Sequence, residues 1–152
     1  PRFAPTDLHA LIRKSLGLLS GQAEKKRIRF DAVLEAVNPE VAVDAEQCTQ
    51  VMLNLLLNGI QILAEGGRIR VSTRDSAEEF TIDIADDGPG IPPAERSRVF
   101  EAFFFRREGG MGLGLAIVQQ IVAAHGGSIE AGDSELGGAL FRIRLPRRSE
   151  ES

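Results

Sequence analysis

Residues 47–61 read QCTQVMLNLLLNGIQ, and this segment decides the fold. Its five carboxamides are spaced 3, 4, 4 and 3 residues apart, which places Gln47, Gln50, Asn54, Asn58 and Gln61 on one face of a helix. Almost every other residue from Val51 to Leu63 is apolar, so most of this helix is expected to be buried. The amide stripe is either a solvent-facing edge, the commoner case for such a pattern alone, or one wall of a pocket. In a pocket, the amide oxygens would face a hard cation such as Mg²⁺ and the NH₂ groups would face phosphate.

The segments on either side predict an α+β fold. Asp44 is the expected N-cap of the amide-bearing helix, Gly66-Gly67 its end, and Thr6 the cap of an earlier helix. The other helices are expected over 7–20, 94–100 and 113–125, and the strands over 28–37, 68–74, 80–84, 128–131 and 139–145. The two strands that end at residues 74 and 84 should form a hairpin. This order of elements predicts helices layered on one face of a mixed sheet.

Composition narrows the class of protein. The chain has 152 residues, which suits one domain, and 43% hydrophobic and 26% charged residues are ordinary values for a folded protein. A formal net charge of −4 disfavours a nucleic-acid partner. The single cysteine, Cys48, excludes an internal disulfide, and no apolar run is long enough to span a membrane. Because the chain begins at Pro1 rather than methionine, we expect it to be a piece of a longer protein.

A first glycine-rich turn, DDGPGIP at residues 86–92, directly follows a predicted strand. Its glycines permit a tight turn and the close approach of a ligand to the backbone. A carboxylate at the strand end, Asp86, could accept a hydrogen bond from an exocyclic amine such as that of adenine. The alternative is that Asp86 and Asp87 only shape the turn, as Asp-Gly pairs often do.

A second glycine-rich stretch, GGMGLGL at residues 109–115, opens a predicted helix. Free N–H groups and the positive end of the helix dipole make such a helix start an anion site. Between the two turns lies VFEAFFFRR, residues 99–107, whose aromatic side chains could pin a segment that closes its arginines over a polyphosphate. Alone, the glycine stretch is a weak signal, and the commoner case for the aromatic stretch is that its phenylalanines are plain core and its arginines plain surface.

Together and in this order, the four elements resemble the ATP-binding catalytic domain of bacterial sensor histidine kinases, most closely the nitrogen-regulation type. This is the Bergerat fold, which type II topoisomerases and heat-shock chaperone ATPases share. The resemblance implies a two-layer α/β sandwich with a mixed, mostly antiparallel sheet of about five strands, covered on one face by about three helices. It spans residues 1–146, and residues 147–152 are expected to be a charged, solvated tail.

The resemblance also implies roles for individual residues. Asn58 matches the asparagine that ligates Mg²⁺, and Asp86 matches the aspartate that reads adenine. Asn54 stands where topoisomerase-type relatives have a glutamate base, which favours phosphoryl transfer over ATP hydrolysis. Arg107 falls where a lysine of the lid is common and is expected to help hold phosphate, which makes it a candidate catalytic residue with Asn54 and Asn58. His125 is expected to be structural, near a helix end.

The residues expected to contact the nucleotide lie in the four matched motifs. They are Asn54, Asn58, Gln61, Asp86, Gly88, Gly90, Ile91, Phe100, Phe104, Arg106, Arg107, Gly110, Met111, Gly112, Leu113, Gly114 and Leu115. Three positions depart from the family pattern: Gln61 stands where lysine is frequent, and Met111 and Ala139 stand where threonine is frequent.

The implied activity is transfer of the ATP γ-phosphoryl group, with Mg²⁺, to a histidine on a separate dimerisation domain, and a response regulator acts downstream. Neither nucleic acid nor direct membrane contact is expected, and the domain should be cytoplasmic, in a parent that can be membrane-anchored. His9 lacks the sequence context of a phosphoacceptor, so the chain alone should not phosphorylate itself. Two alternatives stay open: a serine kinase of the anti-sigma-factor type, and a non-catalytic ATP-binding pseudokinase.

Overall fold

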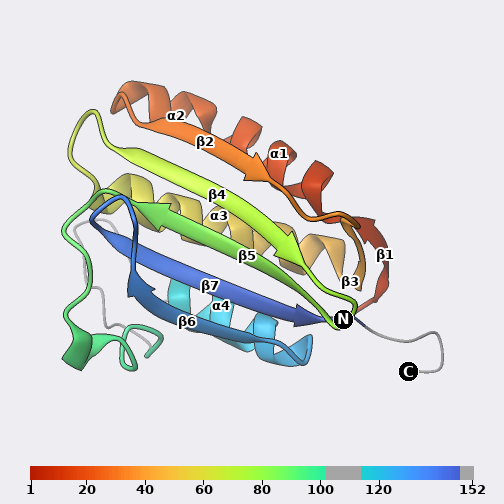
Figure 1. Ribbon diagram of the computed structural model, residues 1–152. Coiled ribbons are helices and arrows are strands. Elements are labelled where there is room, and N and C mark those ends of the chain that lie inside the picture. Colours follow the sequence, from red (N-terminus) through yellow and green to blue (C-terminus); the bar gives the residue numbers. More distant parts are fainter. Residues whose placement is uncertain (102–113, 148–152) are drawn as a thin grey trace.

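The computed structural model describes residues 1–101 and 114–147 (Figure 1). The helices are α1 (Leu8–Leu18), α2 (Ser20–Lys25), α3 (Ala45–Ile62) and α4 (Gly114–Ala124), with a short 3₁₀ helix at Pro93–Glu95. The strands are β1 (Ala4–Asp7), β2 (Arg29–Leu34), β3 (Glu40–Val43), β4 (Arg68–Asp75), β5 (Glu79–Asp86), β6 (Ser128–Asp133) and β7 (Ala139–Pro146).

Five strands form one sheet in the order β2-β4-β5-β7-β6. Only the β2–β4 pair is parallel, and the other three pairs are antiparallel. Helices α1, α3 and α4 lie on the same face of this sheet, and the opposite face carries no helix among the described residues (Figure 1). The expected two-layer sandwich with a mixed, mostly antiparallel sheet is therefore confirmed.

The central helix α3 forms where the amide-bearing segment predicts it. Asp44 is its N-cap, and its Oδ1 accepts a hydrogen bond from the N–H of Gln47 at 3.0 Å. Lys26 lies at the other end, where its Nζ donates to the carbonyl of Ile60 at 2.7 Å. A cation near unpaired carbonyls stabilises a helix C-terminus. Both ends of α3 are thus held by side chains.

Strand β5 shows why the sheet packs on one face only. Its residues Phe80, Ile82 and Ile84 point into the core, whereas Asp83 points to the face without helices. Burial opposes ionisation of Asp83, but hydrogen bonds from Arg142 and Arg74 outweigh it and hold the pKa of this carboxyl below its ordinary value. The outer face is therefore closed by arginine side chains that lie over a central carboxylate.

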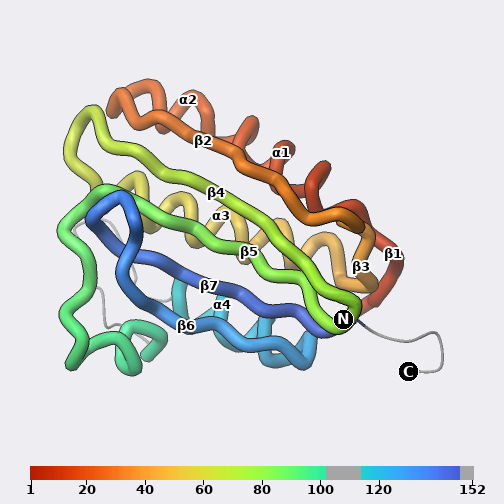
Figure 2. Tube along the Cα trace, viewed as in Figure 1, coloured from red at the N-terminus to blue at the C-terminus, as the bar shows by residue number. Residues whose placement is uncertain are grey.

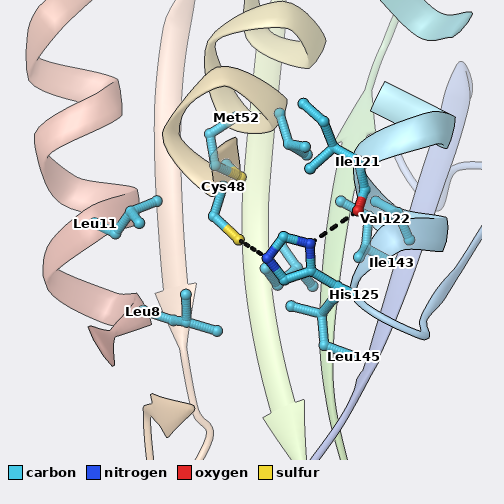
Figure 3. A pocket seen from close by; sticks show the side chains of 11 residues that line it. Leu8, Leu11, Cys48, Met52, Ile121, Val122, His125, Ile143 and Leu145 are labelled. Carbon is cyan, nitrogen blue, oxygen red and sulfur yellow. Dashed lines mark hydrogen bonds between the residues drawn. The ribbon is translucent and has the colours of Figure 1, made fainter. Parts of the chain in front are cut away.

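His125 lies in the core between α1, α3, α4 and the sheet (Figure 3). The ring is 2% exposed, and its Nδ1 bonds the carbonyl of Ile121 at 2.8 Å. These contacts agree with the expected structural role of His125. Burial raises the pKa of the adjacent Cys48 thiol to about 12, so the thiol stays neutral and is no nucleophile at physiological pH.

The N-terminal segment differs from the sequence-based expectation. Thr6 is not a helix cap: it lies in β1, which pairs antiparallel with β3 as a separate two-stranded sheet (Figure 2). The cap is Asp7, whose Oδ1 accepts the N–H of Ala10 at 3.1 Å. The expected helix 7–20 also divides at Leu19 into α1 and α2. β1 and β3 have four residues each, which is too short for a clear alternation of polar and apolar residues. Their pairing partners also lie far along the chain, so no local turn predicts them.

The expected helix at residues 94–100 is also different. The structure has the 3₁₀ helix Pro93–Glu95, followed by turns such as Val99 N–H to the carbonyl of Glu95 at 3.1 Å. Proline at both 92 and 93 fixes the entry to this segment. The chain therefore turns compactly here and forms no regular α-helix.

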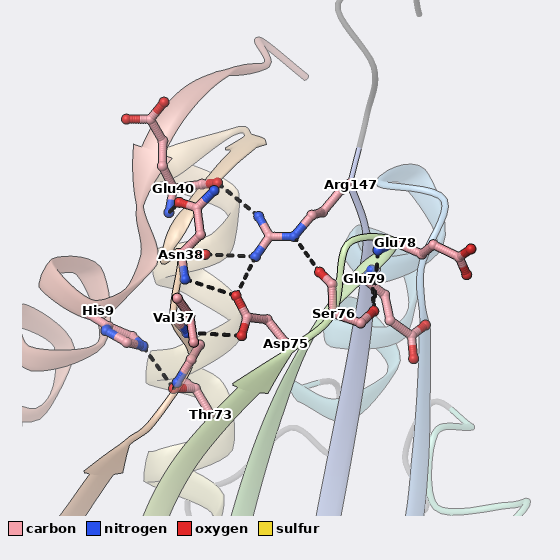
Figure 4. A network of polar contacts seen from close by, with 11 residues as sticks. His9, Val37, Asn38, Glu40, Thr73, Asp75, Ser76, Glu78, Glu79 and Arg147 are labelled. Carbon is pink, nitrogen blue, oxygen red and sulfur yellow. Dashed lines mark hydrogen bonds and ion pairs between the residues drawn. The ribbon is translucent and has the colours of Figure 1, made fainter.

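Arg147 is part of the domain and not of a solvated tail (Figure 4). Its side chain is 16% exposed and its Nη2 lies 2.7 Å from the Oδ2 of Asp75. It also donates to the carbonyl oxygens of Asn38 (2.7 Å), Ser76 (2.9 Å) and Glu40 (3.2 Å). The planar guanidinium has five donors, which lets one side chain join two connections, the one between β2 and β3 and the one between β4 and β5. Arg147 therefore differs from the expected solvated residue, and residues 148–152 lie outside the described part.

We expect Arg147→Ala to lower the melting temperature of the domain by about 5 °C, because several charge-assisted hydrogen bonds are lost together. Backbone N–H groups of Asn38 and Val37, with Arg147, hold the pKa of Asp75 below its ordinary value. The contribution of Asp75 is therefore present above its unfolded pKa and lost as pH falls through its folded pKa. Calorimetry should show the gap between the wild type and Arg147→Ala narrowing in acid.

Arg13→Ala, on the exposed side of α1, is the matched control and should leave the melting temperature nearly unchanged. A difference in melting temperature between the wild type and Arg147→Ala that stays constant as the pH falls would argue against the assigned contact between Arg147 and Asp75.

Candidate nucleotide site

The carboxylate of Asp86, at the end of β5, is held by two neighbouring elements. Its Oδ1 accepts the N–H of Gly88 at 2.9 Å and the N–H of Ala139 at 2.9 Å. The carbonyl of Asp86 accepts the N–H of Gly138 at 3.1 Å. The residue is 7% exposed. The glycine turn and the start of β7 therefore fix the orientation of this side chain.

Burial sets the charge behaviour of Asp86. Desolvation raises the pKa of its carboxyl above the ordinary value, although the N–H groups of Ala139 and Gly88 act in the opposite direction. A buried carboxylate of this kind costs stability when it is ionised. It gains most from a ligand that donates a hydrogen bond to it.

A pocket opens directly beside Asp86. Apolar side chains from α3, the glycine turn and β7 form most of its wall. Its lining residues are Ile62, Asp86, Pro89, Gly90, Ile91, Ala139 and Phe141. Gly90 has a φ of +76°, a conformation that favours glycine. An apolar pocket with one oriented carboxylate suits a flat aromatic ring that carries an amine.

Phe100 and Leu115, two of the expected contact residues, both have buried side chains. The ring of Phe100 packs edge-on against Phe141, with the ring centroids 6.1 Å apart. Leu115 is 5% exposed and belongs to the hydrophobic core. Phe100 thus acts through Phe141, and only the backbone of Leu115 remains as a possible ligand group.

The amide stripe of α3 is partly a solvent-facing edge and partly turned towards the protein, so it combines the two arrangements that the sequence allows. Gln50 and Gln61 are exposed, whereas Gln47, Asn54 and Asn58 are half-buried. The Oε1 of Gln47 is buried without a hydrogen-bond partner among the described residues. One edge of the stripe therefore faces solvent and the other edge faces the protein.

Asn54 brings α3 next to the start of α4. Its Nδ2 lies 3.5 Å from the carbonyl oxygen of Gly114, the first residue of α4. Asn58 lies one turn further along α3, towards the pocket-lining Ile62. The carboxamide wall and the helix N-terminus that the sequence suggested for phosphate are therefore adjacent.

Seven of the expected contact residues lie outside the described residues. They are Phe104, Arg106, Arg107, Gly110, Met111, Gly112 and Leu113.

Gly138 is a site residue that the sequence reasoning missed. A Cβ at this position would collide with the Oδ1 of Asp86 and with the backbone of Gly88. Gly132, in the same hairpin, would meet nothing within 4 Å. A Gly-Gly pair directly before a strand, here at 137–138, is the signal that could have drawn attention to this close approach.

The described residues contain neither a cluster of metal-ligating side chains nor a helix that could span a membrane. Within residues 1–101 and 114–147, no group of three or more His, Cys, Asp or Glu side chains is arranged to hold a metal ion. None of the helices in the same residues is long and apolar enough to cross a membrane.

Comparison with known proteins places this geometry in a family. The family described as "Histidine kinase-, DNA gyrase B-, and HSP90-like ATPase" matches residues 43–149. The chain belongs to this ATPase family.

Within the family, its similarity is to sensor histidine kinases. Sensor histidine kinase ZraS of Escherichia coli (strain K12) is 37% identical over 140 residues, which cover 92% of this chain and 30% of ZraS. The catalytic domain of histidine kinase ThkA has a TM-score of 0.89 and 29% identity, with 97% of each chain covered. Full-length ShkA in complex with AMPPNP has a TM-score of 0.84 and 32% identity, over 97% of this chain and 32% of ShkA. The chain thus corresponds to the ATP-binding catalytic domain of a sensor histidine kinase and spans about a third or less of the full-length proteins it resembles.

We expect Gly138→Ala to disturb this histidine kinase ATP-binding domain far more than Gly132→Ala does. The added methyl group must push Asp86 or the glycine turn away, which should lower the melting temperature and weaken binding of a non-hydrolysable ATP analogue at least about tenfold. Calorimetric melting and titration of both variants would check this. Equal behaviour of the two variants would contradict the assigned close approach.

Proposed function

We propose that the pocket beside Asp86 binds the adenine of ATP, and that the domain donates the γ-phosphoryl group to a histidine on a separate dimerisation domain. The observation that carries the proposal is the buried Asp86 carboxylate, oriented by two N–H groups at the end of an apolar pocket. The AMPPNP complex of the similar protein ShkA supports a nucleotide at this fold.

Adenine is the purine that suits the charge of the site. Its exocyclic amine donates a hydrogen bond, which Asp86 can accept, whereas guanine has a carbonyl oxygen at the same position. An oxygen facing a buried carboxylate would be repelled, and neither group could donate to the other. Ile62, Ile91 and Phe141 supply apolar contacts for the ring. Selectivity for ATP over GTP follows from this pairing.

Asn58 fits the requirement for a magnesium ligand. Its amide oxygen is a hard donor without charge, and the residue is half-buried on α3 between Asn54 and the pocket-lining Ile62. When bound, Mg²⁺ neutralises charge on the phosphates. The N-terminus of α4, next to Asn54, would add its N–H groups and dipole on the phosphate side.

Asn54 favours transfer over hydrolysis. An amide cannot take a proton from water, so this side chain can orient a phosphate or a water molecule but cannot act as a general base. Phosphoryl transfer needs mainly positioning and charge neutralisation, which Asn54, Asn58 and the start of α4 can supply. Arg106 and Arg107 would complete the neutralisation from the segment outside the described residues.

The phosphoacceptor should come from another domain. The two histidines of the chain are both engaged: His125 is 2% exposed, and the Nε2 of His9 lies 2.7 Å from the Oγ1 of Thr73. We therefore propose a dimerisation domain as the direct partner and a response regulator as the next acceptor. The run Asn58-Gly-Ile-Gln61, with Gln61 exposed where many relatives have lysine, supports the nitrogen-regulation type as the subclass.

The Asp86→Asn variant tests the adenine contact. The amide oxygen can still accept the two N–H groups, but its NH₂ faces the adenine amine, so affinity for a non-hydrolysable ATP analogue should fall about ten- to hundredfold. Burial raises the pKa of Asp86, so the wild type loses stability as pH rises through that folded pKa, and Asn does not. The variant should therefore melt at a higher temperature than the wild type at neutral pH, and the difference should shrink in acid.

Asp87→Asn is the matched control, because Asp87 is exposed and binds the N–H of Arg68 at 2.9 Å, away from the pocket. It should bind the analogue within about twofold of the wild type. Undiminished binding by Asp86→Asn would remove adenine from this pocket.

The Asn58→Ala variant tests the metal assignment. Titration of the ATP analogue in the presence of a chelator should give the same affinity for the wild type and the variant, because only the metal contact is removed. Added Mg²⁺ should tighten binding to the wild type and have a markedly smaller effect on the variant. Gln50→Ala, exposed on the same helix, should respond as the wild type does. Full magnesium enhancement in Asn58→Ala would reject Asn58 as a ligand.

A further inference from the structure

Helices α3 and α4 carry the two walls of the proposed nucleotide site, and hydrogen bonds join both ends of α4 to α3. Near the site, the Nδ2 of Asn54 reaches the carbonyl of Gly114 at the long distance of 3.5 Å. At the opposite ends, the Nε2 of His125 lies 3.1 Å from the backbone nitrogen of Asp44, the N-cap of α3. His125 directly follows α4, so it connects the end of one helix to the start of the other.

The hydrogen bonds of His125 fix which ring nitrogen carries the proton. A backbone N–H can only donate, so Nε2 must accept the N–H of Asp44. Nδ1 is then the protonated nitrogen, and it donates to the carbonyl of Ile121 at 2.8 Å. Figure 3 shows the ring between the two helices, with Cys48 on the α3 side. Nε2 therefore connects the ring to the start of α3, and the Nδ1 bond fixes the ring to the last turn of α4.

The N-terminal segment is attached to the same point. The Oδ2 of Asp44 accepts the N–H of Arg2 at 2.8 Å, while Oδ1 caps α3. The ring of Phe3 packs edge-on against His125, with centroids 4.9 Å apart and an interplanar angle of 87°. Strand β1 continues this contact by pairing with β3, the strand that leads into Asp44. Residues 1–7 thus contact the start of α3 through Asp44 and the end of α4 through His125.

We propose that His125 and Asp44 are positioning residues for the nucleotide, and that residues 1–7 influence ATP affinity through them. This inference rests on the proposed ATP function. A helix is a stiff rod, so movement where α3 and α4 meet at His125 changes their spacing near Asn54 and Asn58. Near the site, the side-chain hydrogen bond between the described parts of the two helices is the long one from Asn54 to Gly114. Coupling between two sites is reciprocal, so bound nucleotide must also stabilise the attachment of residues 1–7.

Binding measurements on the 152-residue chain separate positioning from simple stability. His125→Phe keeps an aromatic ring beside Phe3 and removes both hydrogen bonds. Arg147→Ala is the control, because it destabilises the same end of the molecule without touching the α3–α4 connection. At a temperature where both are folded, His125→Phe should bind a non-hydrolysable ATP analogue at least about fivefold more weakly than the wild type, and Arg147→Ala should bind it equally well.

Equal binding by His125→Phe and the wild type would overturn the inference and leave the proposed ATP function intact. Failure of the wild type itself to bind the analogue would instead reject the proposed function, which keeps the two outcomes distinct.

Hydrogen exchange tests the reciprocal effect and does not depend on the folding of His125→Phe. In the wild type, the ATP analogue should slow amide exchange in β1 and β3. Phe3→Ala should abolish that slowing in β1, because it removes the ring contact with His125. The variant should still fold, since Phe3 is 39% exposed and its loss leaves the core intact. Exchange in β1 that is the same with and without nucleotide in the wild type would show that residues 1–7 are not coupled to the site.

Discussion

The double hydrogen bond to Asp86 is the contact on which the site depends. Its two N–H donors come from the turn after β5 and from the start of β7, so the carboxylate is oriented only when both are in place. The adjacency of β5 and β7 in the sheet brings them together, and Gly138 allows the approach because no Cβ intervenes. A buried carboxylate without such partners would be costly. The pairing of β5 with β7 is therefore required to orient the carboxylate of the pocket.

The parts of the fold that the sequence predicts are those fixed by nearby residues. The Asp44 cap, the apolar pattern of α3 and the alternation in β4 and β5 all act over a few positions, and each is confirmed. The parts that it does not predict depend on distant partners. Strand β1 pairs with residues about forty positions away, and Arg147 binds loops that precede it by more than seventy. A short strand or a single arginine carries no local mark of such a partner.

The same division holds inside the candidate site. Asp86 could be named from its glycine turn, because the turn and the carboxylate are adjacent in sequence. Ile91 belongs to the same turn and could be named with it, but Ile62 and Phe141 could not, since they come from α3 and β7 and look like ordinary core residues in the sequence. The amide stripe could be predicted either as a solvent-facing edge or as a pocket wall, and in the structure one side of the stripe is exposed and the other half-buried. Periodicity gives the face of a helix but not what covers it.

Helix α3 links these features into one mechanical unit. Its C-terminal end contributes Ile62 to the pocket, its middle holds Asn54 and Asn58, and its first turn is capped by Asp44. The N-terminal segment binds that cap, while the nucleotide would bind the other end of the same helix. Because α3 has hydrogen bonds at both ends and packs one face against the core along its length, it can transmit a displacement better than it can absorb one. A displacement of the N-terminal segment would therefore reach the proposed nucleotide site through the cap and body of α3.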